Sequence, residues 1–591
     1  MLNELYKYSI DNGISSRAGF KKKSIKAYIL LSDTGEFIGF DPGSPEKVMC
    51  PDIGSAALGP TKCNFIAEKA SIVLGVGKKD NDITKRNFYL QMLGLAKDSE
   101  PLFAICERAL SDKEQLSYMQ TALEASKYKA ADVLSLQVGE IRLEQSKQYY
   151  DWWEEFRTQK SDEDSTKAIK KQVRCLITGA LTDPSETVPK VSGLRVVGGH
   201  SAGDALICFD KPAFCSYGFE QAANAAVSEQ TITAINAALE SMLRDAPSLA
   251  GTKFLHWYKE EVPQELDILN LFDDQVFKFD ESDDEMVDEN HDVNKEALKS
   301  RADQLIKSIE DGIAPEKLDN IYYILMLSGA GGRIMIRSYL QGRYEDLYNN
   351  FKQWLTDLQI TSVNGKGLSR IPKLYAMYFR LLKVEKSTQN TNERMGKELS
   401  GLDMQIKFAI INNTPLPDNV AMKALNYIRS RMFESGESSN ENIPDTVACQ
   451  WLKVWLNRRN RQQGVDNMIQ ESLNTQNPSI AYQAGRMMAV YAAIQTDALG
   501  RDLGAGIIQR YYASASTSPA LVIGKLSVLS QYHLSKIENK AYVYRYEKML
   551  SEIAIQIGTA LPTTLNLEQQ SQFALGYYQQ RAAIYTNKTE D

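Results

Sequence analysis

The pattern of hydrophobic and polar positions changes character near residue 340. Before it, short alternating runs typical of strands stand between helical patterns. The runs IKAYILL and EFIGF flank a turn at 32–35, which predicts a β-hairpin. Further strands are expected at SLQVGEIRL (135–143), GTKFLHWY (251–258) and GGRIMIRSYL (331–340).

Helical patterns alternate with these strands. One predicted helix begins at Ser228. Another covers 297–312, where apolar residues recur at helical spacing and Gly312 can end the helix. Strands and helices interleaved in this way predict that residues 1–340 form a mixed α+β region.

Beyond residue 340 the strand signals fade and helical periodicity dominates. In the last part, Asn477-Pro478 and Ser518-Pro519 each supply an N-cap followed by a proline in the first turn. Gly500 and Gly558 stand where the first and third of four predicted helices can end. We therefore expect a helical middle region at 341–467 and an antiparallel four-helix bundle at 468–591.

Composition indicates an ordinary globular protein. The chain has 591 residues, of which 43% are hydrophobic and 24% charged, and this length predicts two to four domains. We find no apolar run as long as a membrane span and no signal-peptide core. The expectation is a cytoplasmic protein without a membrane partner.

Charge is unevenly distributed along the chain. The net charge is -7, but residues 260–292 hold fourteen Asp or Glu and a single Lys. The rest of the chain is mildly basic, and residues 1–90 contain 13 Lys or Arg against 10 Asp or Glu. We interpret 273–292 as a solvated acidic loop and expect a polyanion to bind elsewhere.

The segment Gly199-His200-Ser201-Ala202-Gly203 spells G-x-S-x-G, the motif of a nucleophile elbow. That elbow needs a strand before the serine and a helix after it. The residues that follow, DALICFD at 204–210, instead favour a strand. The later histidines fall in a predicted strand, the acidic loop and a bundle helix; they are His256, His291 and His533. We therefore interpret the motif as a glycine-rich connector and expect no acyl-enzyme.

Motifs for metals and cofactors are weak. The seven cysteines form no C-x-x-C pair, and GAGGR at 329–333 precedes a strand rather than the helix of a dinucleotide site. We expect no cofactor, while the carboxylate cluster of a metal-dependent nuclease stays open. Buried thiols are favoured over a metal site formed by Cys175, His200, Cys208 and Cys215.

Basic and polar residues near the N-terminus fit nucleic acid. The loop GSAALGPTKCNF at 54–65 carries Ser55, Lys62 and Asn64. Such a loop can enter a DNA groove, with Lys on phosphate and Asn on a base edge, and a solvated surface loop is the alternative. The segment GFKKKSIK adds four lysines at the entry to the hairpin, Lys21, Lys22, Lys23 and Lys26.

A second basic pair lies on a predicted strand. Arg333 and Arg337 are four residues apart, so both side chains should point to the same face. Two arginines on one sheet face suit phosphate groups, and surface ion pairs are the alternative.

Taken in order, several segments resemble one known family, the large subunit (the Cas-eight group, subtype I-C) of the type I-C CRISPR Cascade effector complex. The similarity runs from end to end of the chain. Its segments are GFKKKSIKAYILLSDTGEFIGF, NFIAEKASIVLG, a central run from CLITG through GGHSAGDALICFDKPAFCSYGFEQAANAAVSE, LSGAGGRIMIRSYL, RYYASASTSPALVIGKLSVLSQYHLSKI and QSQFALGYYQQRAAIY.

The resemblance implies a function without catalysis. Such a subunit recognises the protospacer-adjacent motif (PAM) in double-stranded target DNA, promotes unwinding and R-loop formation in antiviral defence, and recruits the helicase-nuclease. A guide RNA then reads the target by base pairing. The implied partners are the guide RNA complex and the backbone and handle-binding subunits of Cascade, and the basic and polar residues named above are the expected DNA contacts.

The family also implies a second product. The C-terminal bundle resembles the small subunit of other Cascade types, which in this subtype is translated from an internal start. Met468 precedes the first bundle helix by a short polar lead, whereas Met487 and Met488 lie inside that helix, so Met468 is the expected start. Three residues of the bundle could follow a DNA strand: Arg510, Lys525 and Lys536. The alternative is that they are ordinary solvated charges on helix surfaces.

Two other classes of function stay open at this point. A nuclease or hydrolase would show activity lost on mutation of one carboxylate or of Ser201. A pure scaffold would contact only other proteins.

Overall fold

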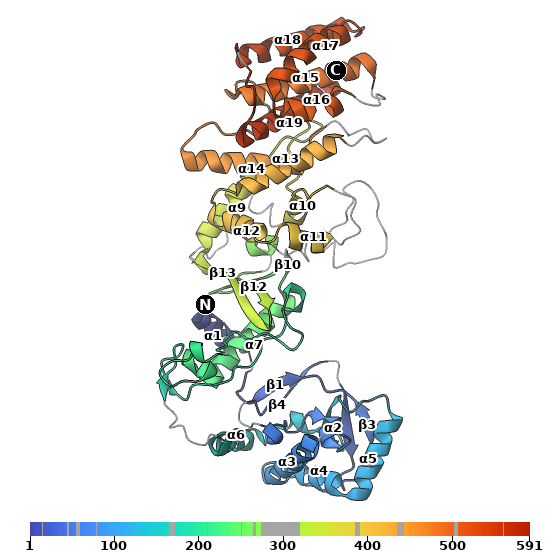
Figure 1. Ribbon diagram of the computed structural model, residues 1–591, viewed down its shortest axis with the longest axis vertical. Coiled ribbons are helices and arrows are strands. Elements are labelled where there is room, and N and C mark those ends of the chain that lie inside the picture. Colours follow the sequence, from blue (N-terminus) through green and yellow to red (C-terminus); the bar gives the residue numbers. More distant parts are fainter. Residues whose placement is uncertain are drawn as a thin grey trace. The chain divides into compact units, whose positions relative to one another are not determined.

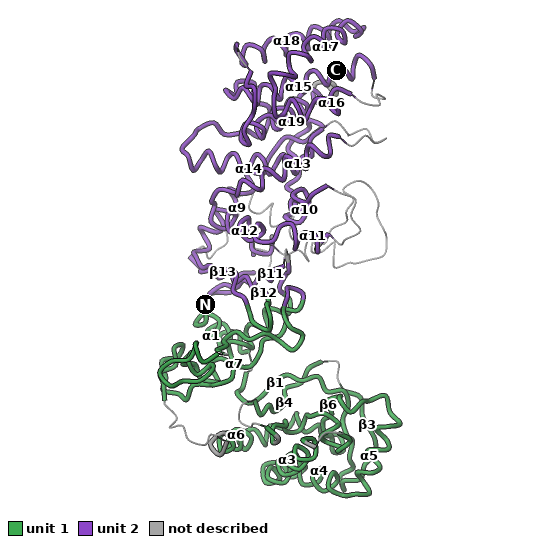
Figure 2. The backbone as a smooth tube through the Cα atoms, viewed as in Figure 1, with its two compact units in different colours: residues 1–195, 199–245, 329–334 green, residues 196–198, 246–328, 335–591 purple. Residues whose placement is uncertain are grey.

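The computed structural model divides into two compact units, which Figure 2 colours separately. Unit 1 comprises residues 1–195, 199–245 and 329–334, and unit 2 comprises 196–198, 246–328 and 335–591. The predicted helix at 297–312 and the predicted acidic loop at 273–292 lie outside the described residues. The structure describes residues 1–590 except 15, 44–45, 55–58, 78–79, 165–171, 210, 250, 264–266, 273–318, 385–390, 434–442, 501–505 and 560.

A five-stranded sheet forms the centre of the N-terminal part of unit 1 (Figure 1). Its strands are β2 (Ala27–Leu31), β3 (Phe37–Pro42), β5 (Glu68–Lys69), β6 (Val133–Val138) and β7 (Ile141–Arg142). The order is β3-β2-β6-β5 with β7 beside β6, and β2 runs parallel to β6 while the other pairs are antiparallel. The predicted hairpin is confirmed as β2 and β3.

Helices supply the rest of the core of this part. Buried sheet residues such as Ile29 and Leu136 share one apolar cluster with Leu93, Phe103 and Trp153 of the helices. Burying such apolar surface is the main favourable contribution to folding. The helices are α2 (Ala70–Val73), α3 (Asp80–Ala96), α4 (Leu102–Ser111), α5 (Lys113–Ala125) and α6 (Tyr150–Asp164).

Unit 1 also contains a two-stranded ribbon and a long helix. The ribbon pairs β1 (Phe20–Lys23) with β4 (Val48–Pro51) in antiparallel register, with Lys22 opposite Met49. The predicted helix after Ser228 is confirmed as α7 (Glu229–Asp245), because the Thr231 N–H donates to Ser228 Oγ at 3.2 Å. The remaining regular elements are α1 (Leu2–Asp11), β8 (Val173–Arg174) and β9 (Leu181–Thr182).

The predicted strand after Gly203 is wrong. Asp204 and Ala205 form only isolated bridges, with Val191 and Arg333 respectively, and no described residue from 206 to 209 belongs to a strand. The Asp204 carboxylate is buried and accepts the His200 N–H at 3.1 Å, which closes the preceding residues into a tight loop. This local bond outweighs the β-propensity of the apolar residues that follow.

Unit 2 holds most of a four-stranded sheet and all the helices from residue 344 onward. The sheet has the order β10 (Ser248–Leu249), β11 (Thr252–Tyr258), β12 (Ile321–Ala330) and β13 (Arg333–Arg343), so the predicted strands at 251–258 and 331–340 are confirmed. The first helices are α9 (Tyr344–Leu358), α10 (Leu374–Phe379), α11 (Thr391–Glu398), α12 (Leu402–Asn412), α13 (Asp418–Phe433) and α14 (Thr446–Gln463).

The C-terminal helices number five among the described residues, not the predicted four. Gly500 and Gly558 end α15 and α18 with φ values of 82° and 72°, as predicted. The cap of α15 is Ser479 rather than Asn477, because Ser479 Oγ accepts the Tyr482 N–H at 3.2 Å. The extra helix is the short α16. The five are α15 (Ile480–Leu499), α16 (Ile507–Ala515), α17 (Pro519–Leu534), α18 (Lys540–Ile557) and α19 (Leu567–Glu590).

The two units together give the α+β class that the sequence predicts, with small sheets followed by a long helical region (Figure 1). Within the described residues, no helix combines the length and the apolar character that crossing a membrane requires.

Candidate nucleic-acid interface

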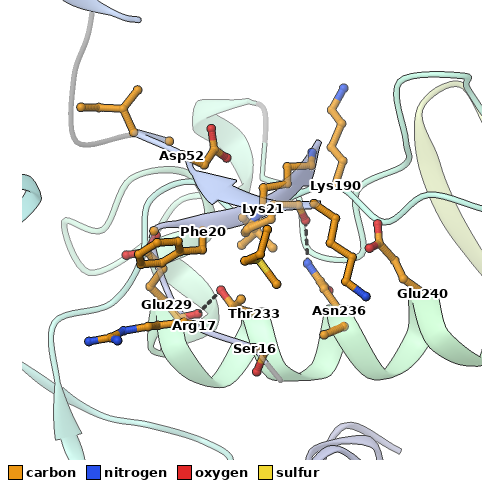
Figure 3. Close-up of a pocket in the computed structure, with 18 of the residues that line it drawn as sticks. Ser16, Arg17, Phe20, Lys21, Asp52, Lys190, Glu229, Thr233, Asn236 and Glu240 are labelled. Carbon is orange, nitrogen blue, oxygen red and sulfur yellow. Dashed lines mark hydrogen bonds between the residues drawn. The ribbon is translucent and has the colours of Figure 1, made fainter. Parts of the chain in front are cut away.

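Unit 1 contains a cavity of about 430 Å³ beside the β1–β4 ribbon. One side is formed by the ribbon and residues 52–54 and 62–64, and the other by α7 and residues 187–190. Figure 3 shows Phe20 and Lys21 on the first side, with Thr233, Asn236 and Glu240 of α7 facing them. Segments more than 200 residues apart in the sequence therefore meet at this cavity.

The cavity brings together four of the residues predicted to contact DNA. Lys21, Lys22, Lys62 and Asn64 all line it, although about 40 residues separate the two lysine groups. β1 contains Lys21 and Lys22 and pairs with β4 in antiparallel register. This pairing brings the chain that follows β4, which contains Lys62 and Asn64, near the first two lysines. Lys22 and Lys62 are both exposed, so their ammonium groups can reach a ligand in solvent.

The lining of the cavity is strongly cationic. It includes only three carboxylates among the described residues, Asp52, Glu229 and Glu240. Glu229 is bound by Arg157 at 2.8 Å, and Glu240 Oε1 accepts the Ser192 N–H at 2.8 Å. Such an excess of positive charge attracts polyanions. The cations are seven: Arg17, Lys21, Lys22, Lys62, Arg157, Lys190 and Arg244.

Five of these cations form no ion pair with any residue of the described part: Lys21, Lys22, Lys62, Lys190 and Arg244. A cation without a protein partner can contact a phosphate without first losing an ion pair. The cavity therefore offers five cations to an anionic ligand.

The other two cations hold the cavity together. Arg157 Nη2 donates to Glu229 Oε1 at 2.8 Å and joins α6 to α7. Arg17 donates to Glu154 and to Asp151 of α6, and the first of these bonds raises the pKa of the Arg17 guanidinium. These two arginines hold the elements around the cavity in place, and their charges are already paired with carboxylates.

Lys23 occupies a different environment from its neighbours. Its Nζ donates to the Pro51 carbonyl oxygen at 2.9 Å and to the Ala67 carbonyl oxygen at 3.5 Å. Burial lowers the pKa of this ammonium group. The position favours a structural role within the ribbon. Lys26 is exposed but does not line the cavity, and Ser55 lies outside the described residues.

The Asn64 amide is engaged within the protein. Oδ1 accepts the Ile53 N–H at 3.3 Å, and Nδ2 donates to Glu68 Oε2 at 3.1 Å. In this state Asn64 fixes the loop that carries Lys62. The predicted contact with a base edge would require these two bonds to be exchanged for bonds to the base.

The predicted arginine pair on β13 is exposed but does not line the cavity. Arg337 Nε donates to Ser328 Oγ at 2.8 Å. Arg333 lies at the first position of β13 and forms the isolated bridge with Ala205.

The predicted residues of the C-terminal bundle are exposed, and two of them lie over aromatic rings. Lys525 Nζ is 5.1 Å from the Tyr511 ring centroid, and Lys536 Nζ is 4.5 Å from that of Tyr532. Arg510 lies on α16. Cations beside tyrosine rings suit single-stranded nucleic acid, whose bases stack on aromatic rings.

Residues named in the hydrolase hypothesis are bonded locally. Ser201 is exposed in a loop, and His200 Nδ1 accepts the N–H of Ala202. His256 Nε2 is bonded to Asp267 Oδ2 at 2.7 Å. Among described residues, no group of three His, Cys, Asp or Glu side chains could hold a metal ion.

The second side of the cavity was not predicted from the sequence. Lys190 precedes an isolated bridge, and Asn236, Glu240 and Arg244 recur along one face of α7. The helical spacing of these polar residues was visible, but it is also the ordinary pattern of a solvated helix face. Only the packing of α7 beside the ribbon shows that these residues line a cavity and do not form a solvated helix face.

The chain matches a known protein family. The model of the family described as CRISPR-associated protein (Cas_Csd1) matches residues 2–585, nearly the whole chain. Comparison with curated proteins gives no match.

Proposed function

The chain belongs to the Cas_Csd1 family of CRISPR-associated proteins, and from this premise we propose that it is the non-catalytic large subunit of a type I-C Cascade ribonucleoprotein. Membership of the family establishes a CRISPR-associated role in defence, as part of an effector complex. The proposal adds that this chain recognises the PAM in duplex DNA, promotes unwinding and R-loop formation, and recruits the helicase-nuclease.

One observation carries the proposal. Lys21, Lys22 and Lys62 meet at a cavity of unit 1 whose free cations outnumber its carboxylates. Phosphate contacts from Lys and Arg supply most of the affinity of proteins for DNA and fix the register of the protein on the duplex. PAM recognition needs contacts with phosphates and contacts with base edges. A cationic site that also contains polar side chains can make both.

Further partners follow from the same role. The guide RNA complex and the backbone and handle-binding subunits of Cascade would hold the chain in place, with the guide reading the target by pairing. Lys525 and Lys536, each beside a tyrosine ring, would follow a displaced strand along the bundle together with Arg510.

The position of Met468 supports an internally translated small subunit. Met468 lies between the end of α14 at Gln463 and the start of α15 at Ile480. A product that begins there keeps α15 to α19 whole. Met487 and Met488 are buried within α15, so a product from either would lose the first turns of that helix.

A selection from a duplex library tests the proposal. The full-length chain, assembled with its guide complex, is incubated with duplexes that carry a randomised motif beside a matching target, and the retained DNA is sequenced. We expect one short motif to be enriched. The variant Lys21→Ala/Lys22→Ala/Lys62→Ala should bind the selected duplex at least tenfold more weakly, with a shallower salt dependence because phosphate contacts are lost.

A matched control separates local contact from total charge. Lys97, Lys113 and Lys129 are exposed in unit 1 and do not line the cavity, so Lys97→Ala/Lys113→Ala/Lys129→Ala makes the same change in net charge. The control should bind like wild type. Equal weakening by the two triple variants, or the absence of any enriched motif, would overturn the proposal.

A further inference from the structure

The cavity of unit 1 has the size of a small-ligand site. Its volume of about 430 Å³ lies within the range of about 300–1,000 Å³ that is usual for pockets enclosing a ligand. A B-form duplex, whose major groove alone is about 12 Å wide, cannot enter it. The portion of a nucleic acid that fits is a single unpaired nucleotide.

Asn236 lines the cavity and carries an unsatisfied hydrogen-bond acceptor. Asn236 is 5% exposed, and its Nδ2 donates to the Pro189 carbonyl oxygen at 2.6 Å. Its Oδ1 has no hydrogen-bond partner within the described part of the chain. Buried polar atoms are almost always paired in folded proteins, so this one indicates a ligand that donates a hydrogen bond.

A second acceptor lies one turn further along α7. Glu240 is four residues beyond Asn236, on the same face of the helix, and also lines the cavity. One of its carboxylate oxygens accepts from the Ser192 N–H. A carboxylate repels phosphate but accepts well from an amino group, so this part of the cavity suits the edge of a base rather than the backbone.

The rest of the lining matches the other parts of a nucleotide. Ile14, Met49 and Val188 are partly buried apolar residues that can cover the face of a base. Lys62 and Lys190 are exposed cations without an ion pair in the described structure, and they can hold a phosphate.

We propose that this cavity binds one unpaired nucleotide of the recognised DNA, with its base edge at Asn236 and Glu240 and its phosphate at the lysines. The inference rests on the proposed function and names the ligand of the same site. Extruding a base costs stacking energy, and a pocket that encloses the base offsets this cost and so favours opening of the duplex. Two acceptors at the base edge favour adenine, cytosine or guanine, which carry an exocyclic amino group, over thymine.

Fluorescence of 2-aminopurine tests the proposal in the full-length chain. The base analogue is placed at each position of the selected motif in turn, and fluorescence is followed on binding. We expect a several-fold increase at one position, where thymine should also weaken binding. Asn236→Ala and Glu240→Gln should each abolish the increase, while Asn12→Ala, an exposed asparagine outside the cavity, should leave it unchanged.

Glu240→Gln keeps the size of the side chain and therefore tests the acceptor even if Asn236→Ala disturbs the loop at 187–190. A duplex that binds with the expected lysine dependence but brightens at no position overturns this inference and leaves the proposed function standing. Failure to bind any duplex overturns the proposed function itself. Brightening only when the analogue is in the guide RNA overturns the assignment to DNA, because the nucleotide would then belong to the guide.

Discussion

Single residues decide whether the cationic cavity keeps its shape. Gly19 has a φ of 80°, and a Cβ there would lie 2.5 Å from Arg157 Nη1. Its carbonyl oxygen accepts from Trp153 Nε1 at 2.7 Å. A residue without a side chain is therefore needed where the chain enters β1 past the arginine that binds Glu229.

Gly19→Ala should displace Arg157 and loosen the contact between α6 and α7. We expect the affinity for duplex DNA to fall several-fold, measured by fluorescence anisotropy. Gly13→Ala is the matched control: Gly13 also has a positive φ, of 56°, but a Cβ there meets nothing within 4 Å. Both variants carry the backbone strain of about 1–2 kcal/mol, so only the clash at Gly19 should affect binding.

Two adjacent lysines of β1 differ in what they contact. Lys22 is exposed at the cavity, whereas Lys23 donates to two carbonyl oxygens. Lys23→Met should therefore keep duplex affinity, and Lys22→Met should lower it by about two- to tenfold, on the order of 1 kcal/mol for one phosphate contact. Titration by anisotropy distinguishes them, and equal losses would contradict the assignment.

Lys23 also predicts a dependence of stability on pH. Burial lowers the pKa of its ammonium group below the unfolded value, which is about 10.4. Between these two values the unfolded chain binds more protons than the folded chain, so the free energy of unfolding rises with pH. Lys23→Met should remove this contribution, measured as the change in unfolding midpoint between neutral and alkaline pH.

Two helices of the bundle meet through reciprocal glycines. A Cβ at Gly485 of α15 would lie 2.0 Å from the Phe573 carbonyl oxygen, and one at Gly576 of α19 would lie 2.1 Å from the Tyr482 carbonyl oxygen. The backbones of α15 and α19 approach so closely that no side chain fits at either position. This contact fixes the pairing of the first and last helices of the bundle.

Gly485→Ala should separate α15 from α19, because the clash involves backbone atoms that cannot rotate away. We expect a destabilisation of about 1–3 kcal/mol, as for overpacking in a core, measured by hydrogen exchange of the α15 amides. Gly524→Ala on α17 is the control, since its Cβ would meet nothing within 4 Å. Higher helix propensity should stabilise that variant by up to about 1 kcal/mol; loss of stability at Gly524 alone would contradict the packing argument.

At the scale of the whole molecule, the segment between α14 and α15 connects the bundle to the rest of unit 2. Asn457 of α14 forms two bonds with the backbone of Ile469, at 2.8 and 3.0 Å. Gln579 of α19 donates to the Gln470 carbonyl oxygen at 2.8 Å. The residues after Met468 are thus held from both sides in the full chain. Of these contacts, a product that starts at Met468 keeps the one from α19 and loses the two from α14.

Met468→Leu should remove the small chain that co-purifies with the full-length protein if that chain is translated from this codon. The full-length protein should fold normally, because leucine replaces a side chain of similar size and polarity. Mass spectrometry of the purified complex gives the result. Met487→Leu should leave the small chain in place, and its loss there would move the start to α15.

The sequence alone determined the local elements and the family. Alternation and turn chemistry located the β2–β3 hairpin, and Gly500 and Gly558 marked the ends of α15 and α18. These features depend on neighbouring residues, so a linear pattern contains them. The loop at 204–209 was missed because a single buried carboxylate bond leaves no repeating pattern in the sequence. The nine-residue α16 was missed because it is shorter than the window of about 11–18 residues over which periodicity is judged.

Only the tertiary structure decided which charged residues form a site. Lys22 and Lys62 were candidates from the sequence, but Lys190, Asn236 and Arg244 joined them only through the packing of α7 beside the ribbon. Pairing of β1 with β4 separated Lys23, whose side chain turns to the carbonyl oxygens of Pro51 and Ala67, from Lys22 next to it. Proximity between residues far apart in the chain arises from burial of apolar surface elsewhere in the unit, and no local spacing encodes it.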